Sequence, residues 1–515
     1  MSIETPMMRQ YLDIKSAYND SILFFRLGDF YEMFFDDAKV ASKELSLTLT
    51  GRGKDDNRVP MCGIPFHAAE GYISKLVQKG YKVAVCEQVE PAEQSKGPTK
   101  RDVVRIITPG TVQLNNVLVE SDCNYLAAIN KSKGKYGIAY LDISTGEFKC
   151  DVLPSYDIAI SELQRLGPKE LLIDDSLSKI DIPFKQAVPF FPYQIKQARE
   201  YLETYFGVKD LSVFQINDLD LSYPAIVGIL EYVEFTQKGR VAQINTCQPA
   251  KIDEGCRINQ GVLNHLDLFS KGGLYDFMNL TKTAMGARLL RQWIRYPLMD
   301  KFKIEARHNR VEYLIENNDQ YEKICSCIEP INDIERLLSK ICSRYDNPKD
   351  LLTLRDSLNE FPTILDYVNQ CNDQFKTERL ELLAICSEDD SIIELINTLN
   401  AALLEDVPTH TRDGAIFRSG YSTELDDLCQ SFSDVRTWIK DLEPKSREAY
   451  DIKSLKVGFN KVFGYYIEIP NSQKDKVPSH FVRKQTLANA ERYITPELKD
   501  KETILLNAKE QQIEI

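Results

Sequence analysis

The pattern of apolar residues changes near residue 255, and this change limits the chain to a multidomain fold. Before that point, short runs of strand-forming residues alternate with helical segments, which is typical of α/β domains. After it, apolar residues recur mainly at helical spacing. The chain has 515 residues, which is too long for one hydrophobic core, so three or more domains are expected.

The first 115 residues predict a compact α/β unit. Helices are expected at 6–18 and 68–79, and strands at 21–26, 30–35 and 81–86. A second α/β pattern covers 120–240. It predicts two strands joined by a Ser-Thr-Gly turn at 136–148, a helix at 157–165 and a strand at 170–174.

The segment GDFYEMF at 28–34 places an aromatic residue, Phe30, two positions before a carboxylate, Glu32. In a strand these two side chains lie on one face, and Tyr31 and Met33 lie on the other. An aromatic residue in such a segment is usually part of a core. The alternative is that Phe30 wedges between base pairs of DNA while Glu32 accepts a hydrogen bond from a base. The segment alone leaves both interpretations open.

Longer motifs surround this segment in a fixed order: LTLTGRG at 47–53, VPMCGIPFHA at 59–68, CEQ at 86–88 and VVRIITPGT at 103–111. This order resembles the mismatch-recognition domain of the bacterial MutS family. The resemblance implies that Phe30 stacks on a mismatched base and that Glu32 hydrogen-bonds it. Three later segments are also similar to that family: TKTAMGARLLRQWIRYPL at 281–298, LKVGFNKVFGYYIEI at 455–469 and RKQTLANAERYITPEL at 483–498.

The resemblance implies a multidomain fold of α/β domains followed by helices. Its expected parts are a mismatch-recognition domain at 1–115, a ribonuclease-H-like connector at 120–240, core and lever helices at 255–425, a β-rich clamp inserted at 426–485, and a returning lever helix at 486–515. The expected function is mismatch recognition in DNA repair, on double-stranded DNA with mispaired bases or small loops. Contacts to the DNA backbone are expected from Lys456, Asn460, Lys461, Arg52 and Lys54.

The helical part carries two more specific expectations. Three arginines in the 281–298 segment recur at helical spacing, and ion pairs between helices and between domains are their expected use: Arg288, Arg291 and Arg295. The pattern of 305–420 predicts long helices. Near the end of the chain, Thr495 is expected to cap a helix that Pro496 begins.

The net charge of −13 argues against a protein that coats DNA indiscriminately. Residues 451–484 nevertheless carry seven basic and three acidic residues, which fits either a solvated face or phosphate contacts. The loop at 93–101 carries three cations and is a further candidate for a backbone contact. Twelve cysteines and five histidines show no zinc spacing, so reduced thiols and no metal are expected.

No run of residues is long enough to span a membrane, and the N-terminus lacks the regions of a signal peptide. A cytoplasmic protein that associates with the nucleoid when bound to DNA is therefore expected, with no membrane partner. The resemblance implies two protein partners, a second copy of the chain and a MutL-type protein that docks on the connector.

The phosphate-loop motif G-x-x-x-x-G-K-[ST], which family members carry in a later ATPase module, does not occur in these 515 residues. The chain is therefore expected to be a fragment or a truncated product, with no catalytic residue and no cofactor, whereas full-length members use ATP and Mg²⁺. Two alternatives stay open. One is a scaffold that docks a repair partner, and the other is a ribonuclease-H-like nuclease using Asp142 with carboxylates from Asp174, Asp175, Asp218 and Asp220.

Overall fold

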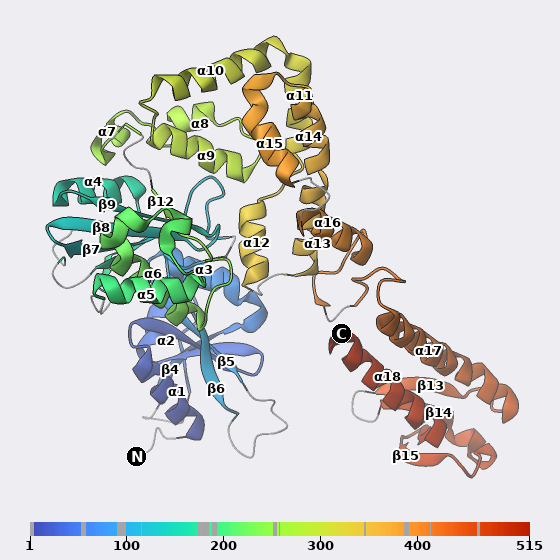
Figure 1. The fold of residues 1–515 in the computed structure, drawn as a ribbon. Coiled ribbons are helices and arrows are strands. Elements are labelled where there is room, and N and C mark those ends of the chain that lie inside the picture. Colours follow the sequence, from blue (N-terminus) through green and yellow to red (C-terminus); the bar gives the residue numbers. More distant parts are fainter. Residues whose placement is uncertain are drawn as a thin grey trace. The chain divides into compact units, whose positions relative to one another are not determined.

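The computed structural model describes residues 5–52, 58–89, 99–114, 116–173, 177, 185–187, 193–250, 255–256, 258–343, 347–385, 391–411, 414–460 and 464–514. The chain divides into two compact units (Figure 1). Unit 1 comprises Met1–Asp346 and Asp356–Ser387, and unit 2 comprises Asn347–Arg355 and Glu388–Ile515. Within the described ranges, none of the helices has the length and apolar character that crossing a membrane requires.

Unit 1 begins with a six-stranded sheet that helices cover on both faces. Its strand order is β3 (Thr50–Arg52), β4 (Val59–Pro65), β2 (Phe30–Phe34), β1 (Ser21–Leu27), β5 (Lys82–Gln88) and β6 (Arg101–Ile107). Strands β1 and β5 are parallel, and the other neighbours are antiparallel. One face packs against α1 (Pro6–Ala17), and the other packs against α2 (Phe35–Leu45) and α3 (Ala69–Gln78).

Most elements of this domain follow from the sequence pattern. The predicted helices at 6–18 and 68–79 and the predicted strands at 21–26, 30–35 and 81–86 are confirmed, with ends shifted by one or two residues. Helix α2 was not predicted. It follows β2 directly, and its N-cap residue, Phe34, makes no side-chain capping hydrogen bond, so the usual start signal is missing.

The second domain of unit 1 contains another six-stranded sheet. Its strand order is β11 (Lys185–Ala187), β10 (Glu170–Ile173), β7 (Leu126–Ser132), β8 (Lys135–Asp142), β9 (Glu147–Leu153) and β12 (Gln248–Pro249). Strands β7, β8 and β9 form an antiparallel meander, and β10 and β11 extend it in parallel on the β7 side. Helix α4 (Tyr156–Leu166) packs on one face, and α5 (Ile195–Phe206) and α6 (Tyr223–Gln237) pack on the other.

A buried carboxylate joins the two α/β domains. Glu170 is 2% exposed and accepts hydrogen bonds from Thr108 Oγ1 (2.6 Å), the backbone N–H of Gly110 (3.3 Å) and Tyr232 OH (2.6 Å). Three donors satisfy its carboxyl oxygens, as a buried polar group requires. A Cβ atom on Gly110 would lie 2.8 Å from the Cβ of Glu170, so the close approach needs glycine. The motif at 103–111 therefore has a structural role between domains.

The helical part of unit 1 is built from short helices. They are α7 (Gln260–His265), α8 (Leu274–Met278), α9 (Ala284–Arg295), α10 (Lys301–Glu316), α11 (Asn318–Ile328), α12 (Ile334–Cys342), α14 (Phe361–Asn369) and α15 (Lys376–Ile385). Helix α13 (Pro348–Asn359) starts in unit 2 and ends in unit 1. The expectation of long helices over 305–420 is wrong, because the described helices there have 9 to 16 residues. Prolines near their ends, such as Pro330 and Pro348, interrupt the helical pattern.

Of the described helices the longest is α17 (Thr423–Ala449) of unit 2, which lies next to α18 (Pro496–Glu514); a shorter helix of this unit is α16 (Ser391–Ala402). Between α17 and α18 in the sequence lies a four-stranded antiparallel sheet of β13 (Lys456–Asn460), β14 (Gly464–Pro470), β16 (Ala490–Ile494) and β15 (Val482–Thr486), in that spatial order. The predicted β-rich range of 426–485 thus begins with helix, and its strands continue to Ile494. The predicted cap is present, because Thr495 Oγ1 accepts a hydrogen bond from the N–H of Leu498 (3.1 Å).

Candidate nucleic-acid interface

Phe30 lies at the tip of a tight hairpin formed by β1 and β2. The turn between the strands uses Gly28, whose positive φ of 58° suits glycine. Phe30 pairs with Leu27 across the hairpin and with Pro65 on β4. The Phe30 side chain is 48% exposed, whereas Tyr31 and Met33 are buried in the core. The predicted alternation along β2 is therefore present, and Phe30 is not a core residue.

The uncovered position of Phe30 has a simple cause. Helix α1 packs Met8 and Tyr11 against Phe25 and Phe34, the residues farther from the tip on the same face of the sheet. Tyr11 contacts both rings in edge-to-face geometry, at centroid distances of 5.5 Å and 5.0 Å. Phe30 is not part of this cluster, so its ring is left at the surface.

Glu32 is paired with a cation. Its Oε2 accepts a hydrogen bond from a terminal nitrogen of Arg52 at 2.8 Å, and the exposed fractions of the side chains are 19% for Glu32 and 49% for Arg52. The two residues come from β2 and β3, with β4 between them. On β4 the residue opposite Glu32 is Gly63, which has no side chain. The arginine can therefore reach across the intervening strand.

The hairpin tip is supported by a network that the sequence did not predict. The guanidinium of Arg26 stacks on Phe66 (3.8 Å to the ring centroid) and lies 3.7 Å from a carboxylate oxygen of Glu87. Tyr31 donates a hydrogen bond to Glu87 as well. Burial and this hydrogen bond raise the pKa of Tyr31, so its hydroxyl stays a donor. The backbone N–H of Phe66 donates to the carbonyl of Asp29 in the turn (3.0 Å).

The residues that are predicted to contact the DNA backbone lie in different parts of the chain. Lys456 is exposed on β13 of unit 2, and Asn460 is half-buried at the end of the same strand. Arg52 lies on β3 of unit 1. Lys54 and Lys461 lie outside the described residues, as does most of the cationic loop at 93–101.

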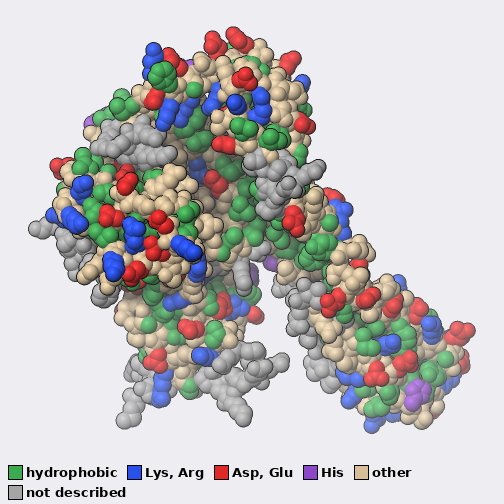
Figure 2. All heavy atoms as spheres, in the orientation of Figure 1, with side chains coloured by type: hydrophobic (Ala, Val, Ile, Leu, Met, Phe, Trp, Pro, Cys, Tyr) green, Lys and Arg blue, Asp and Glu red, His purple; other side chains and the backbone are tan. Residues whose placement is uncertain are grey.

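Several other cations proposed for DNA contact have protein partners. Arg101, at the end of that loop, is buried and donates to the carbonyl oxygen of Arg26 (2.6 Å) and to Gln10 (3.1 Å), so it is structural. In unit 2, Lys474 and Arg483 pair with Glu491 (2.7 Å and 3.3 Å). Lys476 pairs with Asp451 in the same unit. The space-filling view agrees, because acidic and basic side chains intermix on the visible face (Figure 2).

Asp142 is fully buried, and both of its carboxylate oxygens accept local hydrogen bonds. Its Oδ2 accepts from the N–H of Asn124 (2.7 Å), and its Oδ1 accepts from the N–H and the hydroxyl of Ser144 (2.9 Å and 2.6 Å). These bonds organise the turn between β8 and β9. Within the described ranges no group of three metal-binding side chains occurs, while Asp174 and Asp175 lie outside them. The structure gives the nuclease alternative no support.

Two of the three arginines of α9 form ion pairs, as predicted. Arg288 pairs with Asp333 (2.7 Å) and Glu335 (2.6 Å), and Arg291 pairs with Asp122 (3.2 Å). Arg295 instead lies over the ring of Phe269, 5.3 Å from its centroid.

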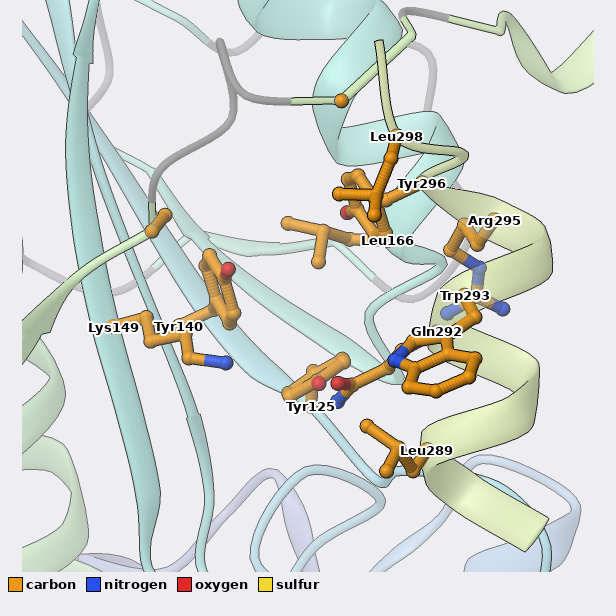
Figure 3. Close-up of a pocket in the computed structure, with 12 residues that line it drawn as sticks. Tyr125, Tyr140, Lys149, Leu166, Leu289, Gln292, Trp293, Arg295, Tyr296 and Leu298 are labelled. Atoms are coloured by element: carbon orange, nitrogen blue, oxygen red, sulfur yellow. The ribbon is translucent and has the colours of Figure 1, made fainter. Parts of the chain in front are cut away.

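A cavity of about 200 Å³ lies between the second sheet and α9 (Figure 3). Gln292 and Trp293 of α9 face Tyr140 of β8 and Tyr125, which precedes β7, across it. Two of its polar side chains, Tyr125 and Gln292, bond to one neighbouring carboxylate. Tyr125 donates to Glu147 (2.7 Å), and Gln292 donates to the same carboxylate (3.4 Å). None of the predicted DNA contacts lines this cavity.

Comparison with known proteins matches the chain to consecutive domains of one family. MutS domain I matches residues 5–116, MutS domain II matches 124–245, and MutS domain III matches 258–510. The first match covers the sheet that carries Phe30, the second covers the sheet with Asp142 except its edge strand β12, and the third spans the helical part and the unit 2 sheet. These matches place domains I, II and III of the MutS type in order along the chain.

Curated relatives are similar in sequence to this chain over nearly its whole length. DNA mismatch repair protein MutS of Brevibacillus brevis is 42% identical over 526 residues, which cover 100% of this chain and 59% of the relative. The proteins of the same name from Desulforamulus reducens and Halothermothrix orenii are 41% and 40% identical, cover 99% of this chain and are themselves covered to 60% and 58%. The chain belongs to the MutS family, as its motifs predicted. It spans about three-fifths of the length of these relatives.

Proposed function

We propose that this chain binds double-stranded DNA at mispaired or unpaired bases, with Phe30 as the wedge. The observation that carries the proposal is the exposed ring of Phe30 at the tip of a buttressed hairpin. Family membership supports it, since the relatives are named DNA mismatch repair proteins. An exposed aromatic ring on a rigid support can enter a base step with little rearrangement of the protein.

The proposed mechanism is mainly indirect readout. Inserting an apolar wedge unstacks a base step and kinks the duplex, which costs a few kcal/mol per step. A mispaired or unpaired step stacks poorly, so the same deformation costs less there than in paired DNA. Phe30 converts this difference into a preference for mismatches, and Glu32 adds a hydrogen bond to the displaced base.

The backbone contacts are proposed to hold the duplex without reading its sequence. Lys456, Asn460 and Lys461 supply them from unit 2, and Arg52 and Lys54 supply them near the hairpin. Phosphate contacts fix position but carry no sequence information, which suits a protein that must act in any sequence context. We assign the clamp role to the sheet of β13 to β16, and the exposed side chain of Lys456 supports this assignment.

We propose a ribonuclease-H-like connector for the second domain. The antiparallel meander β7–β8–β9, extended in parallel by β10 and β11, supports this fold. A MutL-type protein is the proposed partner of the connector, and a second copy of the chain is the other proposed partner. ATP and Mg²⁺ are proposed for the part of the relatives that this chain does not span. A cytoplasmic location close to the nucleoid follows from the proposed substrate.

The proposal is tested by fluorescence anisotropy at ~150 mM salt, where backbone attraction is largely screened. A duplex with one unpaired thymine is compared with its fully paired twin. The chain should prefer the unpaired thymine, and Phe30→Ala should lose that preference while it keeps much of its affinity for paired DNA. Phe302→Ala is the matched control, since it removes an exposed ring of α10 (79% exposed). Equal preference in the chain and in Phe30→Ala would reject the wedge.

The scaffold alternative makes a different prediction. If the chain only docks a repair partner, DNA binding is weak and the Phe30→Ala substitution does not change it. A MutL-type protein would then bind the chain equally well with and without DNA. The same anisotropy series therefore separates the two functions.

A further inference from the structure

The ion pair between Arg52 and Glu32 bears on a physical difficulty at this interface. A carboxylate that faces DNA is repelled by the phosphates, yet Glu32 lies two residues from Phe30 on the same face of β2, which is the proposed contact surface. In the structure its charge is balanced by Arg52 at 2.8 Å. The pair as a whole carries no net charge, so DNA can approach it without that repulsion.

The local architecture is arranged to allow this contact. Arg52 reaches Glu32 from β3 across β4, and Gly63 on β4 lies opposite Glu32. A Cβ atom on Gly63 would lie 3.6 Å from Cγ of Glu32 and 3.4 Å from the carbonyl oxygen of Tyr31. Any larger side chain there would fill the space beside the carboxylate. Because both partners are partly exposed, the pair adds little to folding stability, and its effect should appear in binding.

We propose that Arg52 is a positioning residue. It holds and neutralises Glu32 until a displaced base replaces Arg52 as the partner of the carboxylate. On paired DNA the ion pair stays closed and hides the carboxylate. At an unpaired base, Glu32 accepts a hydrogen bond from the base, and the released guanidinium turns to a phosphate. This inference rests on the proposed mismatch function and adds a specificity role for Arg52 that a simple phosphate contact does not have.

A double-mutant cycle tests the coupling between the two residues. Arg52→Met, Glu32→Gln and the double variant are titrated with paired DNA and with DNA carrying one unpaired thymine. In the original background, Arg52→Met should weaken binding of paired DNA by about tenfold, because it leaves Glu32 charged and unpaired near phosphates. In the Glu32→Gln background the same substitution should cost at most about threefold, the share of one phosphate contact.

Arg58→Met is the matched control. Arg58 lies near the same edge strand, but its guanidinium donates to the carbonyl of Gly51 (3.1 Å) rather than to Glu32. The Arg58→Met substitution should weaken the binding of both duplexes by the same factor, with Glu32 and with Glu32→Gln alike. The same uniform loss for Arg52→Met would overturn the proposal and leave Arg52 as a plain phosphate contact.

The design separates failure of this inference from failure of the proposed function. Coupling between Arg52 and Glu32 in the binding of paired DNA does not require mismatch recognition. A chain that shows this coupling but no preference for the unpaired thymine keeps the ion-pair role and loses the mismatch function. A chain that prefers the unpaired thymine but shows no coupling between Arg52 and Glu32 keeps the mismatch function and loses the ion-pair role.

Discussion

Arg288 donates two hydrogen bonds of 2.7 Å to the two carboxylate oxygens of Asp333, in the bidentate geometry that suits a guanidinium. A third bond, of 3.1 Å, runs from Arg288 to the carbonyl oxygen of Glu120, in the segment between the two α/β domains. One buried side chain thus ties α9 and the start of α12 to the interdomain segment. Arg336 supports the same segment, donating to the carbonyls of Val119 (3.0 Å) and Asp122 (2.9 Å).

Replacing Arg288 should therefore destabilise unit 1. Its side chain is 4% exposed and that of Asp333 is 19% exposed, so Arg288→Met leaves a carboxylate without its main partner. The expected loss is about 3 kcal/mol in the free energy of unfolding, measured with urea. Arg295→Met, on the same helix but without a carboxylate partner of this kind, should change it by less than about 1 kcal/mol. Equal losses would show that the ion pair is not what stabilises this junction.

A second stability prediction concerns the join at Glu170. In Gly110→Ala, the added methyl group would lie 2.8 Å from Cβ of Glu170 and 3.2 Å from Leu126, so the two α/β domains would have to separate slightly. We expect a loss of about 1–3 kcal/mol in the urea denaturation of the chain. Gly71→Ala is the control, since nothing lies within 4 Å of its position in helix α3 and alanine should stabilise the helix by about 0.5–1 kcal/mol. A Gly110 variant as stable as the original would mean that this contact relaxes freely.

The hairpin shows how far the sequence alone could predict the site. Alternation along β2 was enough to place Phe30 and Glu32 on one face, because the strand period of two is fixed by backbone geometry. It could not show that the face is uncovered at Phe30, since that depends on where α1 packs. The partner of Glu32 was equally hidden, because Arg52 lies twenty residues away on a strand that is not its neighbour.

The same limit applies to the rest of the fold. Thr495 and Pro496 were correctly predicted to start a helix, since capping is a local interaction. The motif at 103–111 could be matched to a family, but its contact with Glu170 depends on tertiary structure. The basic excess at 451–484 overstated the free positive charge, because Lys474, Lys476 and Arg483 pair with carboxylates, one of them outside that range. Charge counts do not show which cations are already paired.

Acid should weaken the unit 2 sheet through Glu491. The hydrogen bond from Lys474, helped by Tyr493 and the charge of Arg483, lowers the pKa of the Glu491 carboxyl from 4.5 to about 2. Because the folded-state pKa is the lower one, the stabilisation is present above about pH 4.5 and is lost as the pH falls toward 2. Hydrogen–deuterium exchange of the 482–494 segment, corrected for intrinsic rates, should show extra opening at pH 3 relative to pH 6.

The Glu491→Gln variant checks the assignment of this pH effect. In this variant the 482–494 segment should exchange faster at pH 6, and most of the pH dependence of its opening should be lost, because the carboxylate at position 491 is no longer there to be protonated. Glu448→Gln, at an exposed position of α17, is the control and should behave like the original chain. A pH dependence that survives in Glu491→Gln would have to come from other carboxylates of this unit.

Glu32→Ala is expected to reduce the preference for an unpaired thymine rather than the affinity for DNA in general. The substitution removes the hydrogen bond to a displaced base, and it also removes a negative charge close to the phosphates and releases Arg52. Binding of paired DNA should therefore stay the same or become tighter, while the preference for an unpaired thymine falls. The anisotropy series on the two duplexes measures both quantities. A selective gain for the mismatched duplex would contradict the role given to Glu32.

Lys456 should contribute equally to the binding of paired and mismatched DNA. As an exposed cation of β13 it is proposed to touch a phosphate, so Lys456→Met should weaken binding of paired and mismatched duplexes by the same factor. It should also lower the slope of log affinity against log salt by about one, because one fewer counterion is released. Lys476→Met is the matched control, since its ammonium is paired with Asp451 and its loss should leave that slope nearly unchanged. If both variants changed the slope equally, the ion pair of Lys476 would open on DNA, and the contact surface of unit 2 would be wider than β13.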